Sequence, residues 1–314
     1  FDLYRPTLNA QLPTLLDNAA VALRHPRQRA RFEIAAASLH GFRAALDGLG
    51  FTEVSTPKIV GAATESGANV FAVDYFGRRA FLAQSPQLYK QVLVGVFERV
   101  YETGHVFRAE PHDTARHLAE YTSLDAELGF VRDHFDVMRV VREVVAAMVA
   151  AIRTRAQAAV ALLGVEIPEV PDEIPWIHFS ETGVDDLDLA PADERRLCEQ
   201  HGELLFVTGF PLAKRPFYTH PEPARPGYSN SFDLLFRGLE VVTGGQRLHR
   251  HEDYVRALAG ETAAYEGYLE AFRHGMPPHG GFALGLERWV AQLVGARNIR
   301  ETTLFPRDLR RTAP

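Results

Sequence analysis

The sequence predicts an α+β fold in which a mainly antiparallel β-sheet is flanked by helices. Short apolar stretches with strand character follow one another in runs, instead of alternating one by one with helical stretches as in a parallel sheet. The chain has 314 residues, of which 46% are apolar and 24% charged. This composition is typical of a globular protein with a sizeable core.

Helices are predicted where apolar residues recur with helical spacing. Gly48 and Gly50 should end the first helix, and the Ser-Pro pair at residues 85 and 86 should open the second. The third, rich in valine and alanine, is the longest. The predicted helices cover residues 28–49, 85–97, about 135–163 and 287–295.

Strands are predicted for the apolar or alternating stretches between these helices. Pro57 should stop the first strand, and Gly77 lies near the turn of a predicted hairpin at 72–84. The segment 63–71 is polar and contains glycine, so it is expected to be a loop. The other predicted strands cover residues 51–60, 99–110, 122–131, 203–210, 232–244 and 280–286.

The domain organisation is predicted to be simple. Residues 1–27 are interpreted as an arm or hinge, and residues 28–314 as one catalytic domain with a small insertion at about 165–205. The net charge of −6 gives no broad basic surface for nucleic acid. A single cysteine, Cys198, rules out an intrachain disulfide and a cysteine zinc cluster. No signal peptide or apolar run of about 20 residues is present, so we expect a cytoplasmic protein without membrane contact.

The stretch FRAEPHDTARHL (107–118) carries the first candidate site. An arginine at a strand end can present a planar fork to a phosphate. Arg108 and Glu110 are two residues apart, so on a regular strand they would face one ligand from the same side. From this pattern alone, a surface ion pair in a hairpin is the more common explanation.

The stretch SFDLLFRGLEVVTGG (231–245) carries the second candidate site. Asp233 and Glu240 are an odd number of residues apart, so a regular strand would place them on opposite faces, but a bend or bulge at Gly238 could bring both to one metal ion. Thr243 adds a hydroxyl group. Mg2+ uses few protein carboxylates together with substrate phosphate oxygens, which suits this sparse set. Two solvated acids beside a buried strand remain the alternative.

Together these stretches resemble the signature motifs of class II aminoacyl-tRNA synthetases, and those of the aspartyl-tRNA synthetases of the archaeal type and their bacterial counterpart in particular. FTEVSTPKI (51–59) resembles motif 1, FRAEPHDTARHL motif 2 and GLERW (285–289) motif 3. Further matches follow in the family's order: AQSPQLYKQ, RPFYT, SFDLLFRGLE, GGQRLH and GMPPHGG.

The resemblance implies ATP-dependent formation of aspartyl-adenylate from L-aspartate, with transfer to the acceptor end of tRNA, on a class II synthetase fold that dimerises through motif 1. It implies that Arg108 and Arg288 are catalytic and that Asp233, Glu240 and Thr243 surround Mg2+. The implied ATP-binding residues are Arg108, Glu110, His117, Tyr121 and Arg288. The implied aspartate-binding residues are Glu65, Ser85, Gln87, Lys90, Asp125 and Arg247. Lys90 and Arg247 would pair with the side-chain carboxylate, and a neutral amide in its place would cost several kcal/mol.

Two departures from the family leave alternatives open. Thr243 stands where the nearest relatives have serine, although the hydroxyl group is kept. Residues 1–27 are also too short for the N-terminal anticodon-binding barrel of aspartyl-tRNA synthetases. A free-standing paralogue that passes the adenylate to ammonia, as an asparagine synthetase does, or to another small acceptor is therefore an alternative. A non-catalytic binding paralogue is disfavoured, because all of the charged motif residues are present.

Overall fold

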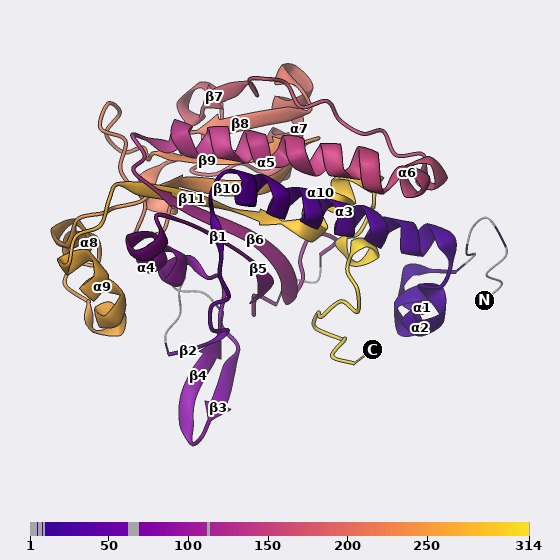
Figure 1. Cartoon of the computed structure of the whole chain (residues 1–314), viewed down its shortest axis with the longest axis horizontal. Helices are drawn as coiled ribbons and strands as arrows, with labels where there is room; N and C mark the ends of the chain where they lie inside the picture. The colour runs from indigo at the N-terminus through magenta and orange to yellow at the C-terminus, as the bar shows by residue number, and fades with distance from the viewer. Residues whose placement is uncertain (1–4, 6–7, 9, 62–68, 112–113, 314) are drawn as a thin grey trace.

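The computed structural model describes residues 5, 8, 10–61, 69–111 and 114–313. Its central element is an eight-stranded sheet, shown in Figure 1, in which the only parallel pairs are β1–β5 and β7–β8. The predicted α+β fold with a mainly antiparallel sheet is therefore confirmed. From one edge to the other, the strands are β1 (Thr52–Glu53), β5 (Arg99–Phe107), β6 (Glu120–Gly129), β11 (His279–Gly285), β10 (Leu239–Gln246), β9 (Ser231–Phe236), β8 (Leu204–Thr208) and β7 (Trp176–His178).

A small second sheet projects from the body of the molecule (Figure 1). It contains β2 (Ile59–Val60), β4 (Arg78–Leu82) and β3 (Ala72–Tyr75), in that order. The predicted hairpin at 72–84 is confirmed, with a turn in which Gly77 has a φ of 78°. The strand predicted to begin at residue 51 and to be stopped by Pro57 is shorter than expected, because β1 covers two residues; β2, after the proline, belongs to the small sheet. Pro57, which has no N–H to donate, lies between them.

Helices α3 (Pro26–Gly48) and α5 (His134–Arg155) lie side by side across one face of the large sheet (Figure 1), together with α10 (Leu286–Val294). The His25 ring caps the start of α3, and the Asp133 carboxylate caps α5 by accepting from the backbone N–H of Phe135 at 2.9 Å. The long helix predicted at 135–163 is two helices, because the backbone of Ala156 leaves the helical region between α5 and α6 (Gln157–Leu163).

The remaining helices surround the other face and the edges of the sheet. Helix α4 opens directly after the Ser-Pro pair, as predicted. The segment 165–205, expected to be an insertion, contributes β7 to the edge of the main sheet and a helix that contacts β8. These helices are α1 (Leu12–Asp17), α2 (Ala19–Ala22), α4 (Gln87–Phe97), α7 (Pro191–His201), α8 (His251–Ala257) and α9 (Glu266–Arg273), with 3-10 helices η1 (Phe179–Glu181), η2 (Leu212–Lys214), η3 (Ala263–Tyr265) and η4 (Ile299–Thr302).

The two faces of the central strands differ in chemistry. On β6, the residues Leu124, Ala126 and Leu128 belong to the apolar core formed with α3, α5 and α10. The alternate residues of the same strand are polar and face the opposite side. The functional site is therefore expected on the face that α3 and α5 leave uncovered. None of the helices in the described part of the chain has the length and apolar character that a membrane crossing requires.

Candidate functional site

The floor of the site is a row of residues that crosses four strands. Asp125 on β6 pairs with Ala283 on β11, Ala283 pairs with Thr243 on β10, and Thr243 pairs with Asp233 on β9. Directly paired residues of antiparallel strands point to the same face. The row therefore places Asp125 at one end and the predicted metal ligands Thr243 and Asp233 at the other, with the small side chain of Ala283 between them.

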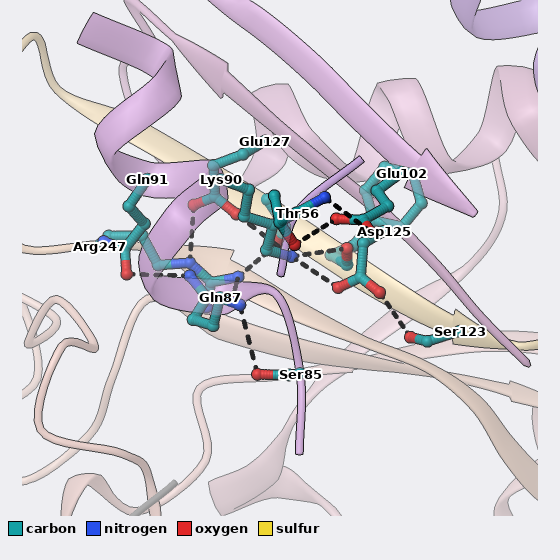
Figure 2. Close-up of polar contacts among 12 residues, drawn as sticks. Thr56, Ser85, Gln87, Lys90, Gln91, Glu102, Ser123, Asp125, Glu127 and Arg247 are labelled. Carbon is teal, nitrogen blue, oxygen red and sulfur yellow. Dashed lines mark hydrogen bonds and ion pairs between the residues drawn. The ribbon is translucent and has the colours of Figure 1, made fainter. Parts of the chain in front are cut away.

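Four buried charged groups form a cluster at the β6 end of this row (Figure 2). Lys90 Nζ lies 3.0 Å from Asp125 Oδ1 and 3.3 Å from Glu127 Oε2, and it donates to the Phe282 carbonyl at 3.1 Å. Arg247 Nε lies 2.9 Å from Glu127 Oε1. Although burial opposes it, the positive charges of Arg247 and Lys90 lower the pKa of Glu127. The cluster contains two cations and two anions, so its formal charge is zero.

Lys90, Arg247 and Asp125 were predicted from the sequence, and Glu127 was not. A ligand was expected to neutralise Lys90 and Arg247, whereas the structure already pairs both with carboxylates. Strand periodicity could have identified Glu127, because it follows Asp125 by two residues and lies on the same face of the strand. Gly281 pairs with Glu127 across the sheet, and a Cβ atom on it would lie 2.0 Å from Glu127 Oε2.

The start of α4 brings Ser85 and Gln87 to the same cluster. Ser85 Oγ accepts from the backbone N–H of Gln87 at 3.3 Å, and Gln87 Oε1 accepts from Arg247 at 3.4 Å. A cavity of about 210 Å3 opens beside these side chains. Its walls include Ser85, Gln87, Asp125, Arg215, Thr243 and Arg247. Glu65, the remaining residue predicted to bind aspartate, lies outside the described residues.

A second cavity, of about 390 Å3, contains the residues predicted to bind ATP. Strand β5 ends at Phe107, so Arg108 and Glu110 lie beyond it, and the argument that placed them on one face of a regular strand does not apply. Both nevertheless line this cavity, as do His117, Tyr121 and Arg288. Burial raises the pKa of Tyr121, while the neighbouring Arg108 and Arg288 act in the opposite direction.

The two cavities meet at a shared wall. Arg108, Tyr121, Ser123, Thr243 and Ala283 line both of them. Since Arg108 belongs to both, a group bound in the smaller cavity and a phosphate bound in the larger one would meet at its guanidinium. This arrangement fits a reaction between a small polar molecule and a phosphate ester.

A hairpin turn and a β-bulge bring the predicted metal ligands together, and only a bend or bulge at Gly238 was predicted from the sequence. The strand predicted at 232–244 is wrong: Arg237 and Gly238 form the turn of a hairpin between β9 and β10. A bulge then lies between Glu240 and Val242. As a result, Glu240 pairs with Leu235, which shares its face with Asp233.

The acids of this group are only partly neutralised. Asp233 Oδ2 pairs with Arg215 at 3.0 Å, and Glu240 lies 3.6 Å from Arg288. The buried Oδ1 atom of Asp233 has no hydrogen-bond partner among the described residues. Burial raises the pKa of Glu240 to about 7, to which the charge of Asp233 also contributes.

The group fits Mg2+ on the chemistry of its donors. Two carboxylates, one of them with a buried oxygen that has no hydrogen-bond partner in the described part of the chain, and a hydroxyl group suit a cation that takes its other ligands from water and phosphate. No group of three or more histidine, cysteine, aspartate or glutamate residues in the described segments is arranged so that it could hold a metal ion by itself.

Two further buried residues, His279 and Glu287, make hydrogen bonds close to the site, and Glu287 also lines the larger cavity. His279, expected to make either a pocket contact or a structural hydrogen bond, is buried and lies 2.9 Å from both Gln91 Nε2 and the Pro277 carbonyl. Glu287, which the sequence analysis did not single out, accepts from the Thr122 N–H at 3.0 Å, and burial raises its pKa to about 7. Glu287 precedes Arg288 in the GLERW motif, and this position in the sequence could have identified it as a residue near the site.

Comparison with known proteins identifies the family. Residues 11–309 match the model of the tRNA synthetases class II (D, K and N). The chain belongs to the class II tRNA synthetases. It is therefore a ligase, and the predicted resemblance and enzyme class are confirmed.

Individual relatives of this class II synthetase cover nearly all of its length. It is 46% identical to the aspartate–tRNA(Asp/Asn) ligase of Deinococcus radiodurans over 98% of this chain and 76% of the relative. It is 47% identical to the enzyme of the same description from Thermus thermophilus, over 96% of this chain and 75% of the relative.

Solved structures agree on the fold. The asparaginyl-tRNA synthetase of Pyrococcus horikoshii complexed with asparaginyl-adenylate has a TM-score of 0.92 and 31% identity, covering 97% of this chain and 74% of that one. The aspartyl-tRNA synthetase of Entamoeba histolytica has a TM-score of 0.84 and 31% identity, covering 98% and 64%. Since both amino acid types occur among these structures, the choice of substrate depends on the side chains of the site.

Proposed function

We propose that this class II synthetase activates L-aspartate with ATP and transfers the aspartyl group to tRNA. The observation that carries the proposal is the charge-balanced cluster of four side chains, Lys90, Arg247, Asp125 and Glu127, next to the smaller of two cavities that share Arg108. Relatives that are 40–47% identical and are described as aspartate–tRNA ligases support this choice of amino acid.

The balance of charge in the cluster favours aspartate. The α-ammonium group would bind at Asp125 and the side-chain carboxylate at Lys90 and Arg247, which adds one positive and one negative charge to a neutral cluster. The α-carboxylate of either amino acid would point out of the cluster toward Arg108 and the phosphate. Asparagine has a neutral amide in place of the side-chain carboxylate, so the ammonium charge placed in the cluster would have no matching negative charge at Lys90 and Arg247. Such an imbalance costs several kcal/mol, which is enough for strong discrimination.

The reaction follows from the position of Arg108 between the cavities. An oxygen of the aspartate α-carboxylate attacks the α-phosphorus of ATP, and the bond to pyrophosphate breaks. Arg108 would offset the charge that develops on the α-phosphate, with Arg288 and His117 on the side of the departing pyrophosphate. Glu110 would bind the adenine amino group, and Tyr121 would stack on the ring. A hydroxyl group of the tRNA end then attacks the aspartyl carbonyl and releases AMP.

Asp233, Glu240 and Thr243 would hold Mg2+, which offsets phosphate charge when it is bound. Ionised Glu240 is needed for this role, and Arg288 lies near enough to favour that form. Ser85 and Gln87 would hold the start of α4 and the Arg247 guanidinium in place around the amino acid. Glu65 would contact the bound aspartate.

Exchange of radioactive pyrophosphate into ATP tests the first half of this proposal. We expect exchange with aspartate and little with asparagine, followed by aspartylation of added tRNA. Consumption of the adenylate by ammonia, with no transfer to tRNA, would favour the asparagine-forming alternative. No exchange with either amino acid would contradict the catalytic function itself.

We also propose that two copies associate through motif 1. Strand β1 forms one edge of the large sheet, and its Thr52 and Glu53 are exposed. An exposed strand edge offers backbone groups that a second chain can pair with. Sedimentation at micromolar concentration should give the mass of a dimer, and a monomer there would contradict this proposal.

A further inference from the structure

Arg215 occupies the predicted metal site in the structure. Its guanidinium lies 3.0 Å from Asp233 Oδ2 and donates to Thr243 Oγ1 at 3.5 Å. The same group stacks over the Phe210 ring, with its central carbon 3.9 Å from the ring centre. Only 16% of the Arg215 side chain is exposed. Arg215 thus contacts two of the three residues to which the proposed function assigns Mg2+.

The charges explain why a cation is needed there. The bulge in β10 places Glu240 on the same face as Asp233, so two carboxylates share one part of the cavity. Arg215 and Arg288 supply two positive charges to these two acids. Arginine does not lose its proton in proteins, so Arg215 can yield its place to another cation only by moving away.

There is room for such a movement. Arg215 lines the smaller cavity, and it also lines a neighbouring cavity of about 410 Å3 that shares Pro216 and Thr219 with the first. A guanidinium that leaves Asp233 can therefore enter either space without unfolding the strand hairpin. The cation–π contact with Phe210 is worth about 1–2 kcal/mol, and a metal ion that displaces Arg215 has to offset it.

We propose that Arg215 is an internal counter-cation: it neutralises Asp233 when no metal is bound, and Mg2+ displaces it from Asp233 and Thr243. This inference rests on the proposed function, because it requires the metal at these residues. Arg215 is then a positioning residue that competes with the metal, and removing its charge should strengthen metal binding in the absence of ATP.

The test measures binding of Mn2+ alone, which is paramagnetic, by electron paramagnetic resonance. It uses the whole chain, the variants Arg215→Gln and Asp233→Asn, and the control Arg237→Gln. Arg237 is a matched control because it pairs with Glu203 at 2.8 Å and stacks over Phe236 at 4.9 Å, outside the cavity. We expect Arg215→Gln to bind Mn2+ roughly tenfold more tightly than the wild type, about 1.4 kcal/mol. Arg237→Gln should leave the affinity unchanged.

The outcomes separate this inference from the proposed metal site. Binding to the wild type that is lost in Asp233→Asn but unchanged or weaker in Arg215→Gln overturns the counter-cation role alone. No Mn2+ binding to either the wild type or Arg215→Gln overturns both. If circular dichroism shows that Arg215→Gln does not fold, Arg215→Lys replaces it. Lysine lacks the planar fork and should give an increase of a few-fold, and no increase again overturns the inference.

Discussion

Replacing Lys90 by glutamine should reduce the preference for aspartate over asparagine more than any other single change in the buried charge cluster beside the small cavity. Only 2% of the Lys90 side chain is exposed, and its ammonium group lies between the carboxylates of Asp125 and Glu127. Glutamine keeps a similar length but removes the charge. The cluster would then carry a net negative charge before any substrate binds.

The size of the effect follows from the spacing of the charges. Two charges about 4 Å apart interact by about 4 kcal/mol at an effective dielectric constant of 20. If the aspartate carboxylate loses one such partner, its preference over asparagine should fall by about 3–4 kcal/mol, or a factor of 10^2–10^3. The protein should also lose about 3–5 kcal/mol of unfolding free energy, because a buried ion pair loses one member.

The assay compares kcat/KM for pyrophosphate exchange with aspartate and with asparagine, together with urea unfolding. Lys58→Gln is the control, since Lys58 lies 2.7 Å from Glu102 and 26% of its side chain is exposed. The control should keep the wild-type preference, since Lys58 does not line the small cavity, and it should lose less stability than Lys90→Gln because Lys58 is partly exposed. A folded Lys90→Gln variant in which both substrates lose the same factor would refute the reasoning.

Three further predictions concern packing and pH. In Gly281→Ala the new Cβ atom should push the Glu127 side chain aside. We expect kcat/KM for aspartate to fall at least about tenfold and the unfolding free energy to fall by about 1–3 kcal/mol. An unchanged urea unfolding curve would contradict this prediction. Burial lowers the pKa of His134 from 6.5 to about 4, so the folded protein loses stability as the pH falls below 6.5. Between pH 7.5 and 5, the unfolding free energy of His134→Leu should fall by about 2 kcal/mol less than that of the wild type, measured by urea unfolding at both pH values. Burial raises the pKa of Glu287 to about 7, so the folded protein loses stability as the pH rises from 4.5 through 7. Between pH 4.5 and 8, the unfolding free energy of Glu287→Gln should therefore rise by about 2–3 kcal/mol relative to that of the wild type. Parallel pH profiles of the two proteins would contradict this prediction.

The sequence alone determined the class of fold and most of the secondary structure. The hairpin around Gly77, the helix after Ser85 and Pro86, and the helix after β11 follow from local signals that need no distant partner. The ordered motifs were also sufficient for the family. The same local rules failed where one apolar stretch could form either one strand or two, as at 232–244, because a turn at Arg237 and Gly238 is decided by pairing with neighbouring strands.

Only the tertiary structure decided which charges meet. Lys90, Glu127 and Arg247 lie on α4, on β6 and after β10, and the sheet register brings them within 2.9–3.3 Å. The bulge after Glu240 and the position of Arg215 over Asp233 likewise depend on the alignment of β9 with β10. Periodicity along one strand shows which side chains share a face, but the partners across the sheet follow from register, which is set by packing of the whole core.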